Sequence, residues 1–286
     1  MNKNHMNIKS FIADKKVSLK SAPTKLDNLY SSKEAGEKNL AEIRDDIVDV
    51  QKILSADRRY SVLLILQGMD TSGKDGVVRH VFSGVNPQGV RVVSFKKPSD
   101  EELAHDYLWR CQMRLPERGQ IGVFNRSYYE EVIVVKVVPE LLKYQNLPEI
   151  SADIWKDRYK EINQFEERMF RNGTKIIKCF LNISKDEQRK RLLERLDDRE
   201  KNWKFQPGDL VARKEWDKFE KAYEECLENT SSKECPWYII PADEKLNARL
   251  VVASILKETL EELPLRYPEL DTEIRSRIDQ FKKELG

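Results

Sequence analysis

The stretch with the clearest chemistry is a glycine-rich loop that follows an apolar run, LLILQGMDTSGKDG, at residues 63–76. Gly68, Gly73 and Lys74 fit the spacing G-x-x-x-x-G-K, in which successive backbone N–H groups surround a phosphate. The helix that leaves such a loop adds the positive end of its dipole, and the lysine adds a point charge on the phosphoryl group. The spacing therefore predicts a phosphate-binding loop. The alternative is a tight strand-to-helix turn with an exposed lysine.

Two carboxylates belong to this loop, where they would repel phosphate unless a cation or a basic side chain lies between. Asp70 lies inside the loop, and Asp75 takes the position after Lys74 at which Ser or Thr is usual. For Asp70 we expect a role in holding Mg²⁺, or Mn²⁺ in its place. A general base is less needed, because an acceptor phosphate is largely dianionic at neutral pH. Asp75 either holds the loop through backbone N–H groups or is an acid favoured by the helix dipole.

A second polar stretch, NRSYYEE, begins at Asn125, at the carboxyl end of a predicted central strand. Because this strand ordinarily ends in Asp, we expect Glu130 to supply the missing charge and to hold the metal with Asp70. The alternative for Glu130 is a capping box with a helix that begins at Ser127. Arg126 suits bidentate contact with phosphate, and its alternative is a surface salt bridge.

A basic segment at residues 187–208 predicts a lid that closes over phosphates and excludes water. Arg191 and Arg195 are four residues apart and share a helix face, and Lys204 follows them. The alternative is a solvated charged helix in which neighbouring acids are the partners. Periodicity alone favours that alternative.

Other side chains near these stretches are weaker candidates. The basic ones are Lys96, Lys97, Arg110 and Arg114, which together with the lid would form a track longer than a nucleoside triphosphate needs. The aromatic ones are Trp109, Tyr128 and Tyr129. They could stack a base, although aromatic residues beside such sites more often belong to the core.

Short apolar runs alternate with amphipathic helices along most of the chain, and these elements would position the candidate residues. The apolar runs are β-branched and do not alternate with polar residues, as in buried parallel strands; they lie at 61–66, 90–95, 120–125, 174–183 and 236–240. Helical patterns lie at 32–56, 154–171, 185–196, 210–227 and 246–263. This order predicts an α/β fold, a parallel sheet of about five strands flanked by helices, with ligands at the carboxyl ends of the strands.

The two ends of the chain have a different character. Residues 1–30 are polar and predict an extended N-terminal arm, whereas residues 31–286 predict a single domain that includes the lid. A final charged helix is expected at 271–285, on the surface.

The composition argues against several classes of protein. The net charge is only +2 over 286 residues, which does not suit a general nucleic-acid binder. No cysteine pair has C-x-x-C spacing and there are three histidines, so a zinc site is not expected and a reduced compartment fits. The N-terminus has no apolar signal-peptide core, and no apolar run approaches the ~20 residues that span a bilayer. We therefore expect a soluble cytoplasmic protein without nucleic-acid or membrane partners.

Taken in order, six motifs resemble the polyphosphate kinase 2 family, and within it the class III group. They extend over most of the chain and are GMDTSGKDG (68–76), NPQGVRVVSFKKPS (86–99), HDYLWR (105–110), GVFNRSYYEEV (122–132), RLLERLDDREKNWKF (191–205) and PWYIIPADEK (236–245). The resemblance implies a phosphate-loop kinase fold similar to thymidylate kinase. It also implies Mg²⁺-dependent, reversible phosphoryl transfer between inorganic polyphosphate and nucleotides, from AMP to ADP and from ADP to ATP.

The resemblance also assigns roles to residues. Asp70 and Lys74 match the family's Walker A acid and lysine, and Asn125 and Arg126 match its Walker B position. The lid module matches at Arg191, Arg195 and Lys204, and the remaining expected phosphate or nucleotide contacts are Gly68, Met69, Thr71, Ser72, Gly73, Asp75, Gly76, Lys96 and Arg110. The pattern that runs from Asn125 to Glu130 is similar to the branch that accepts nucleoside mono- and diphosphates. The expected partners are polyphosphate, adenine and guanine nucleotides, and further copies of the chain in a dimer or tetramer.

Two other functions remain open from the residues alone. One is an ordinary ATP-dependent nucleotide or small-molecule kinase, against which Asp75 and Asn125 both argue. The other is a nucleotide-binding regulator that binds tightly without turnover.

Overall fold

A single parallel sheet organises the part of the chain described by the computed structural model, residues 6–27 and 29–286. Its five strands are β1 (Ser61–Gln67), β2 (Val90–Ser94), β3 (Ile121–Asn125), β4 (Thr174–Asn182) and β5 (Trp237–Pro241), in the order β2-β3-β1-β4-β5. The predicted parallel sheet is confirmed, and each strand lies within about two residues of its apolar run. Because β1 is central, its carboxyl end meets those of β3 and β4 at one edge.

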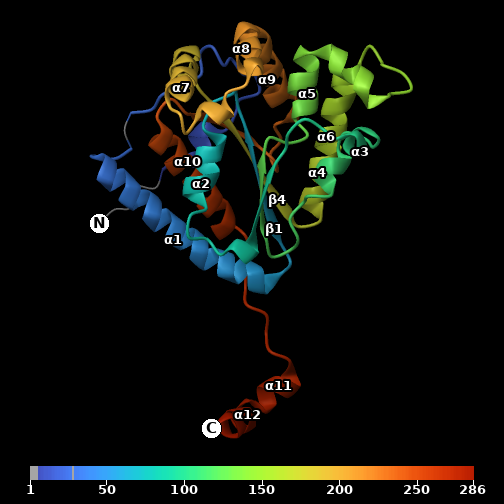
Figure 1. The fold of residues 1–286 in the computed structure, drawn as a ribbon. Coiled ribbons are helices and arrows are strands. Elements are labelled where there is room, and N and C mark those ends of the chain that lie inside the picture. The colour runs from blue at the N-terminus through green and yellow to red at the C-terminus, as the bar shows by residue number, and fades with distance from the viewer. Residues whose placement is uncertain (1–5, 28) are drawn as a thin grey trace.

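Helices cover both faces of the sheet (Figure 1). On one face α10 (Lys245–Glu261) packs against α1 (Lys33–Asp57) and α2 (Lys74–Val81). On the other face α5 (Glu130–Val137), α6 (Ile154–Arg171) and α9 (Trp216–Thr230) pack against one another. The long helix expected near residues 32–56 is thus confirmed as α1, which begins after Ser32, whose Oγ accepts from the Ala35 N–H at 3.2 Å.

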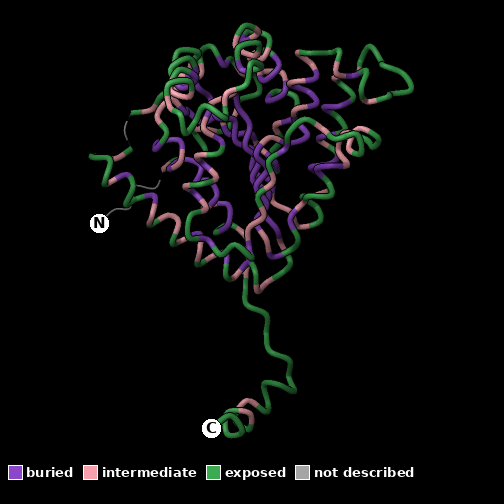
Figure 2. The backbone as a smooth tube through the Cα atoms, viewed as in Figure 1, coloured by how far each residue is buried: buried purple, intermediate pink, exposed green. Residues whose placement is uncertain are grey.

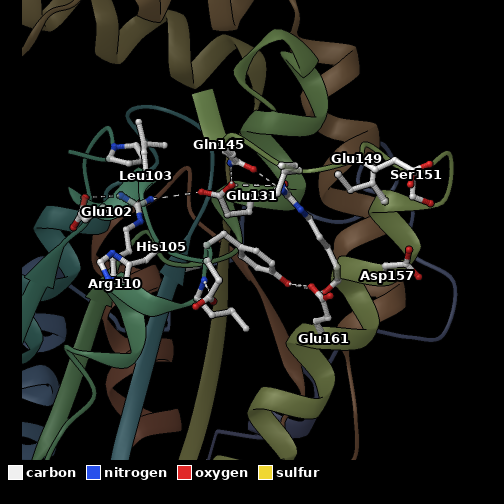
Figure 3. Close-up of a pocket in the computed structure, with 17 residues that line it drawn as sticks. Glu102, Leu103, His105, Arg110, Glu131, Gln145, Glu149, Ser151, Asp157 and Glu161 are labelled. Atoms are coloured by element: carbon white, nitrogen blue, oxygen red, sulfur yellow. Dashed lines mark hydrogen bonds and ion pairs between the residues drawn. The ribbon is translucent and has the colours of Figure 1, made fainter. Parts of the chain in front are cut away.

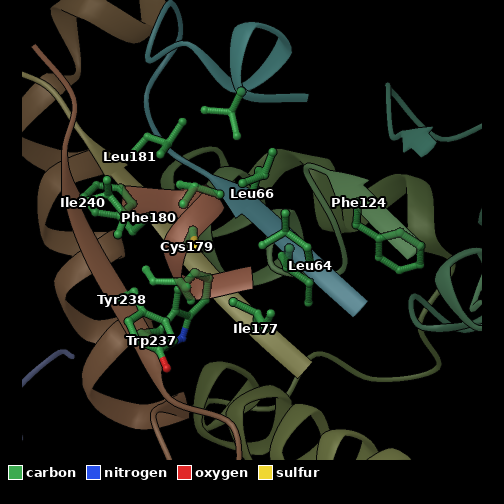
Figure 4. Packing of buried hydrophobic residues seen from close by; sticks show 14 of the residues in the cluster. Leu64, Leu66, Phe124, Ile177, Cys179, Phe180, Leu181, Trp237, Tyr238 and Ile240 are labelled. Atoms are coloured by element: carbon green, nitrogen blue, oxygen red, sulfur yellow. The ribbon is translucent and has the colours of Figure 1, made fainter. Parts of the chain in front are cut away.

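The core lies between these layers, where the buried backbone of Figure 2 is concentrated. Every residue of β1 is buried, as expected of a strand without polar alternation. Figure 4 shows the packing around β4 and β5, whose buried side chains include Phe180, Leu181 and Trp237. The Trp237 indole N–H donates to Thr230 Oγ1 at 2.8 Å, so this large buried side chain leaves no polar atom unsatisfied.

Two helices that the sequence predicts as continuous are divided. The pattern at 210–227 is split at Glu215 into α8 (Pro207–Lys214) and α9, and α8 starts earlier because Pro207 occupies its first turn. The last helix is split at Arg277 into α11 (Thr272–Ser276) and α12 (Ile278–Leu285), which stand away from the body in Figure 1. Apolar spacing continues across such a bend, so periodicity alone does not reveal it.

The N-terminal arm packs against the body as an ordered segment. Ile8, in a 3₁₀ turn at Ile8–Phe11, and Leu19 are buried. The Ala13 N–H donates to the Trp237 carbonyl at 2.8 Å, and Ile12 forms an antiparallel bridge with Tyr238. The arm therefore covers the outer edge of β5, which would otherwise present unpaired backbone groups. Residues 1–5 and 28 of the predicted arm lie outside the described residues.

The remaining helices are short or belong to the lid. They are α3 (Asp100–Leu103), α4 (Trp109–Gln112) and α7 (Lys185–Asp197), and 3₁₀ turns lie at Pro87–Gly89, Pro139–Gln145 and Asn202–Lys204. Over the described ranges 6–27 and 29–286, none of the helices has the length and apolar character needed to cross a membrane.

Candidate active site

The glycine-rich loop joins β1 to α2 with a backbone that its glycines make feasible. Gly68 has φ +149° and Gly73 has φ +104°, both in the region that favours glycine. A Cβ at Gly68 would lie 2.7 Å from the Leu181 carbonyl oxygen, so a side chain there would clash with β4. Thr71 adopts φ +68° without being glycine, which places local strain in the loop itself.

Lys74, the first residue of α2, turns its ammonium into the loop. Its Nζ donates to the Gly68 carbonyl at 2.8 Å, to the Met69 carbonyl at 3.2 Å and to Ser72 Oγ at 3.3 Å. Burial, and after it the positive charge of Arg126, lower the pKa of Lys74 to about 8. The exposed lysine of the alternative interpretation is therefore not observed. Phosphate oxygens would be stronger acceptors for this ammonium than the neutral carbonyls it now contacts.

Arg126 lies between the two acids predicted to hold metal. Its NH2 donates to Asp70 Oδ1 at 2.6 Å and its NH1 donates to Glu130 Oε2 at 2.8 Å. The neighbouring Glu130 carboxylate, followed by that of Asp70, raises the pKa of Arg126. The residue has φ +63°, so the strand end is strained where the arginine projects. An ion pair is present, as in the alternative interpretation, but it joins the loop to the strand end and does not lie apart on the surface.

Glu130 does not cap the helix in which it lies. Helix α5 begins at Glu130, and Ser127 Oγ accepts from the Tyr129 N–H at 3.2 Å, so the capping-box alternative is wrong. The Oε1 atom of Glu130 is buried and has no hydrogen-bond partner in the structure. An unpaired buried carboxylate oxygen beside a phosphate loop marks a position for a further ligand.

Asn125 and Asp75, the two departures from the ordinary pattern, are partners. Asn125 Nδ2 donates to Asp75 Oδ1 at 2.6 Å, across the space between the strand end and the first turn of α2. Asp75 thus occupies the helix position favoured by the dipole, and its hydrogen bond joins a side-chain amide rather than a backbone N–H. The two substitutions are mutually consistent, because an amide donor at the strand end suits a carboxylate on the helix.

The acids of the site suit Mg²⁺ bound together with a phosphate substrate. Within residues 6–27 and 29–286, no group of three or more His, Cys, Asp or Glu side chains is arranged to hold a metal. Mg²⁺ generally takes one or two protein carboxylates and completes its shell with phosphate oxygens and water. Asp70 and the free oxygen of Glu130 fit that requirement, and both are hard oxygen donors.

Arg191, expected to reach phosphate from the lid, is engaged with backbone carbonyls instead. Its NH1 donates to the Thr71 carbonyl at 2.9 Å, and its NH2 donates to the Ala242 and Asp243 carbonyls at 2.7 and 2.9 Å. Its Nε donates to Glu187 Oε1 at 2.8 Å. Because the side chain is buried, Arg191 is neither an unpaired cation of the lid nor part of a solvated helix face in this structure. It fastens α7 to the phosphate loop.

The outer part of the lid is more exposed. Arg195 pairs with Asp209 at 3.5 Å, near the start of α8. Burial raises the pKa of Asp209, and the Asp70 carboxylate raises it further because the start of α8 lies near the phosphate loop. No spacing pattern in the sequence indicates a role for Asp209. Lys204 is exposed, with its Nζ 5.2 Å from the Trp203 ring, as in the solvated alternative.

Arg110 and Lys96 do not act as free cations in the structure. Arg110 is buried, its NH1 donates to the Lys96 carbonyl at 2.8 Å, and it pairs with Glu102 at 3.6 Å and Glu131 at 3.9 Å. The Lys96 side chain is exposed. Nearby carboxylates already neutralise the charge of Arg110, and its contact with phosphate stays a prediction.

A cavity of about 430 Å³ lies beside this arginine, between α3, α4 and α6 (Figure 3). Acids outnumber arginines on its wall; they are Glu102, Asp106, Glu131, Glu149, Asp157 and Glu161. Its two arginines, Arg110 and Arg158, are both paired with Glu131, and burial raises the pKa of that carboxyl. The wall comes from residues 98–161 and includes five residues of the motif HDYLWR (105–110), but tertiary packing assembles it, so spacing along the chain does not predict a cavity.

The aromatic residues suggested for base stacking divide between core and surface. Tyr128 and Tyr129 are fully buried, so the core alternative is confirmed for both. Trp109 stacks on His105 with ring centroids 4.0 Å apart, and it is partly exposed.

Comparison with known proteins agrees with this geometry. Residues 30–266 match the family model described as Polyphosphate kinase 2 (PPK2). An ADP-polyphosphate phosphotransferase of Rhodopseudomonas palustris is 50% identical over 273 residues, which cover 94% of each chain. An AMP/ADP-polyphosphate phosphotransferase of Meiothermus ruber is 46% identical over 240 residues, covering 84% of this chain and 86% of the relative.

A solved structure extends the agreement to the fold. The crystal structure of polyphosphate kinase 2 from Arthrobacter aurescens TC1 aligns with a TM-score of 0.87 and 38% identity, over 96% of each chain. The match therefore includes the sheet, the phosphate loop and the lid, and this chain belongs to the polyphosphate kinase 2 family.

Proposed function

We propose that this protein transfers phosphoryl groups reversibly between inorganic polyphosphate and adenine nucleotides, forming ADP from AMP and ATP from ADP. The observation that carries the proposal is the meeting of Lys74, Arg126, Asp70 and Glu130 around one strained loop. Two cations and two acids at the carboxyl ends of β1 and β3 suit a reaction in which two anions must be held end to end. Family membership and the names of the relatives support the same substrates.

Each residue has a separate task in this reaction. The loop N–H groups and Lys74 hold the phosphoryl group in transit and stabilise its charge. Arg126, now divided between Asp70 and Glu130, exchanges a carboxylate for phosphate oxygens when substrate arrives. When bound, Mg²⁺ would supply charge neutralisation between the two reactants, with Asp70 and Glu130 as its protein ligands. Catalysis is positioning and charge stabilisation, without a covalent enzyme intermediate.

The acid-lined cavity separates the two substrates by charge. Its volume of about 430 Å³ is within the range of small-molecule sites, but its carboxylates repel a polyphosphate chain. A nucleoside carries no charge on its base, and the exocyclic amino groups of adenine and guanine donate hydrogen bonds that carboxylates accept. We therefore assign the nucleoside end of the acceptor to this cavity and polyphosphate to the side of the phosphate loop where Lys74 and Arg126 lie.

The proposal also covers which nucleotides accept the phosphoryl group. The Asn125-to-Glu130 stretch resembles the class III branch, so AMP and ADP are both expected acceptors. Guanine nucleotides are expected to react because they present amino donors as adenine does. Assembly into a dimer or tetramer also stays a prediction, for which sedimentation of the purified protein is the measurement.

A product assay tests the proposal. Purified protein is incubated with AMP, Mg²⁺ and long-chain polyphosphate without ATP, and ADP and ATP are followed by chromatography. ADP followed by ATP is the expected result, and GMP in place of AMP tests the guanine prediction. ATP from ADP alone, with AMP untouched, would keep the family activity and overturn the class III assignment.

A second incubation separates the rival functions. AMP with ATP and no polyphosphate should give little ADP, whereas an ordinary nucleotide kinase would produce it readily. Tight nucleotide binding without product under either condition would favour the non-catalytic regulator. Omission of Mg²⁺ should abolish transfer, and Mn²⁺ should restore part of it.

A further inference from the structure

The N-terminal arm is connected to the phosphate loop by a continuous chain of hydrogen bonds. Thr24 Oγ1 donates to Asp243 Oδ2 at 2.8 Å, and the Asp243 N–H donates back to the Thr24 carbonyl at 2.9 Å. Asp243 Oδ1 accepts from the Ser184 N–H at 2.8 Å, at the cap of α7. The Asp243 carbonyl accepts from Arg191, whose other nitrogen holds the Thr71 carbonyl. Asp243 is the junction of this chain.

The end of the chain lies at the most constrained point of the loop. Thr71 has φ +68°, a conformation that non-glycine residues keep only when the surroundings impose it. Arg191 supplies that constraint through a planar guanidinium whose three nitrogens all donate hydrogen bonds, and a planar fork transmits its orientation more rigidly than an ammonium would. A shift of Arg191 would therefore displace the carbonyl of Thr71 and the loop N–H groups around it.

The arm is anchored where it meets Asp243. Asn182, at the end of β4, donates through Nδ2 to the Pro23 carbonyl at 3.2 Å. Asn247, in α10, donates through Nδ2 to the Leu26 and Asp27 carbonyls at 3.3 Å each. Both asparagines are buried. The side-chain amides of both residues donate to backbone carbonyls of one short segment. They therefore hold residues 22–27 in a fixed position over the carboxyl ends of β4 and β5.

We propose that residues 22–27 set the geometry of the phosphate loop through Asp243, which acts as a positioning residue for Arg191 and Thr71. The inference rests on the proposed function and adds a role for the arm and for the motif PADEK, which begins at Pro241. The arm does not contact the reacting groups. It fixes α7 and, through Arg191, the loop amides that bind the donor phosphates.

The test is Thr24→Val, which removes the hydroxyl but keeps the shape of the side chain. The KM for polyphosphate should rise about tenfold, the lower end of the range expected for one hydrogen bond to a charged group, while the KM for AMP stays within about twofold. Asp243→Asn should raise the polyphosphate KM further, because it also weakens the cap of α7. The matched control is Glu228→Ala, which removes the exposed arm contact to the Val17 N–H, 2.8 Å from Glu228 Oε1, and should change neither KM.

Hydrogen exchange in the absence of substrate provides a second measurement that does not depend on activity. Amides of residues 68–74 should exchange faster in Thr24→Val than in the wild type, and Glu228→Ala should leave them unchanged. Unaltered loop exchange in a folded Thr24→Val protein, or equal increases in both KM values, would overturn the inference. A wild type that forms no product from polyphosphate would defeat the proposed function instead, and the exchange comparison would still decide whether the arm controls the loop.

Discussion

Two clusters of charged and polar side chains meet in residues 126–130 and differ in their exposure and in how fully their polar atoms are hydrogen-bonded. The loop cluster consists of Asp70, Arg126 and Glu130, with side-chain exposures of 25%, 35% and 13%. The buried cluster consists of Tyr128, Tyr129, Glu166 and Lys178, and the last two have side-chain exposures of 3% and 0%. Arg126 and Glu130 thus face the phosphate loop, whereas the two tyrosines between them face the core.

The buried cluster is fully satisfied. Glu166 Oε1 accepts from the hydroxyls of Tyr128 and Tyr129 at 2.7 and 2.6 Å, and its Oε2 accepts from Lys178 Nζ at 2.7 Å. Lys178 also donates to the Thr230 carbonyl at 2.5 Å. Burial raises the pKa of both tyrosines well above the ordinary value, so they stay donors. Each side-chain polar atom in this cluster already has a hydrogen-bond partner.

The loop cluster keeps such capacity. Glu130 Oε1 has no partner, and Arg126 holds two carboxylates in a partly solvated place where phosphate can compete for it. A partly exposed ion pair costs little to exchange, whereas a buried one is expensive to break. The comparison indicates that the tyrosines fix the start of α5 so that the residues on either side can change partners without moving the backbone.

The largest effect should come from Lys74→Met. Loss of the ammonium removes the charge that stabilises the phosphoryl group in transit, and activity should fall about 10³-fold. The folded state should be as stable as the wild type or more so, because burial already disfavours this charge, as its lowered pKa indicates. Steady-state kinetics and urea unfolding measure both. Retention of most activity would refute the assignment of Lys74.

A substitution in the buried cluster should instead lower the stability of the fold. Glu166→Leu leaves the Lys178 charge buried without its counter-ion, and the free energy of unfolding should fall by about 3–5 kcal/mol. The double variant Glu166→Leu/Lys178→Met removes both charges and should recover most of that loss. Urea unfolding of the two variants decides the point. If the single and double variants are equally unstable, the cost lies in packing rather than in the unpaired charge.

The same two clusters mark what could be predicted from the sequence and what could not. The loop, the strand ends and the closeness of Asp70, Lys74 and Arg126 follow from local spacing, because neighbouring strands and one turn bring these residues together. The sheet was equally accessible, since five buried runs alternate with helices. The hydrogen bond between Asn125 and Asp75, 50 residues apart, cannot be predicted from spacing, although both residues depart from the ordinary phosphate-loop pattern.

Residues with roles in tertiary packing are the ones whose contacts the sequence does not predict. Arg191 fits a lid pattern, yet its contacts are with Thr71, 120 residues away, and with the turn after β5. Arg110 fits a basic track, yet Glu131 reaches it from another helix. Charge type is visible in a sequence, but whether a charge is already neutralised depends on partners that periodicity does not report.

Glu130→Gln should sharpen the distinction between the clusters. It keeps the shape of the side chain but removes the negative charge, so activity should fall about 10²-fold and half-maximal activity should require more Mg²⁺. The free energy of unfolding should change by less than about 1 kcal/mol, because the ion pair with Arg126 is partly solvated. A Mg²⁺ titration and urea unfolding test these two expectations. A large loss of stability with unchanged Mg²⁺ dependence would make Glu130 a structural residue like Glu166.

The smallest effect concerns pH and has opposite signs for activity and stability. With its pKa lowered to about 8, free Lys74 loses its proton above that pH, and kcat/KM for polyphosphate should then fall about tenfold per pH unit. Stability should rise over the same range, because between pH 8 and about 10.5 the unfolded chain retains a proton that the folded protein has released. Lys74→Arg, which stays charged, should lack the alkaline fall in kcat/KM, and Lys74→Met should lack the rise in stability. If kcat/KM still falls at alkaline pH in Lys74→Arg, another group is responsible for the titration, and Lys74 stays protonated in the free enzyme. The Lys74 ammonium would then resemble Lys178 of the buried cluster, whose charge does not respond to substrate, more than the exchangeable charges of the loop cluster.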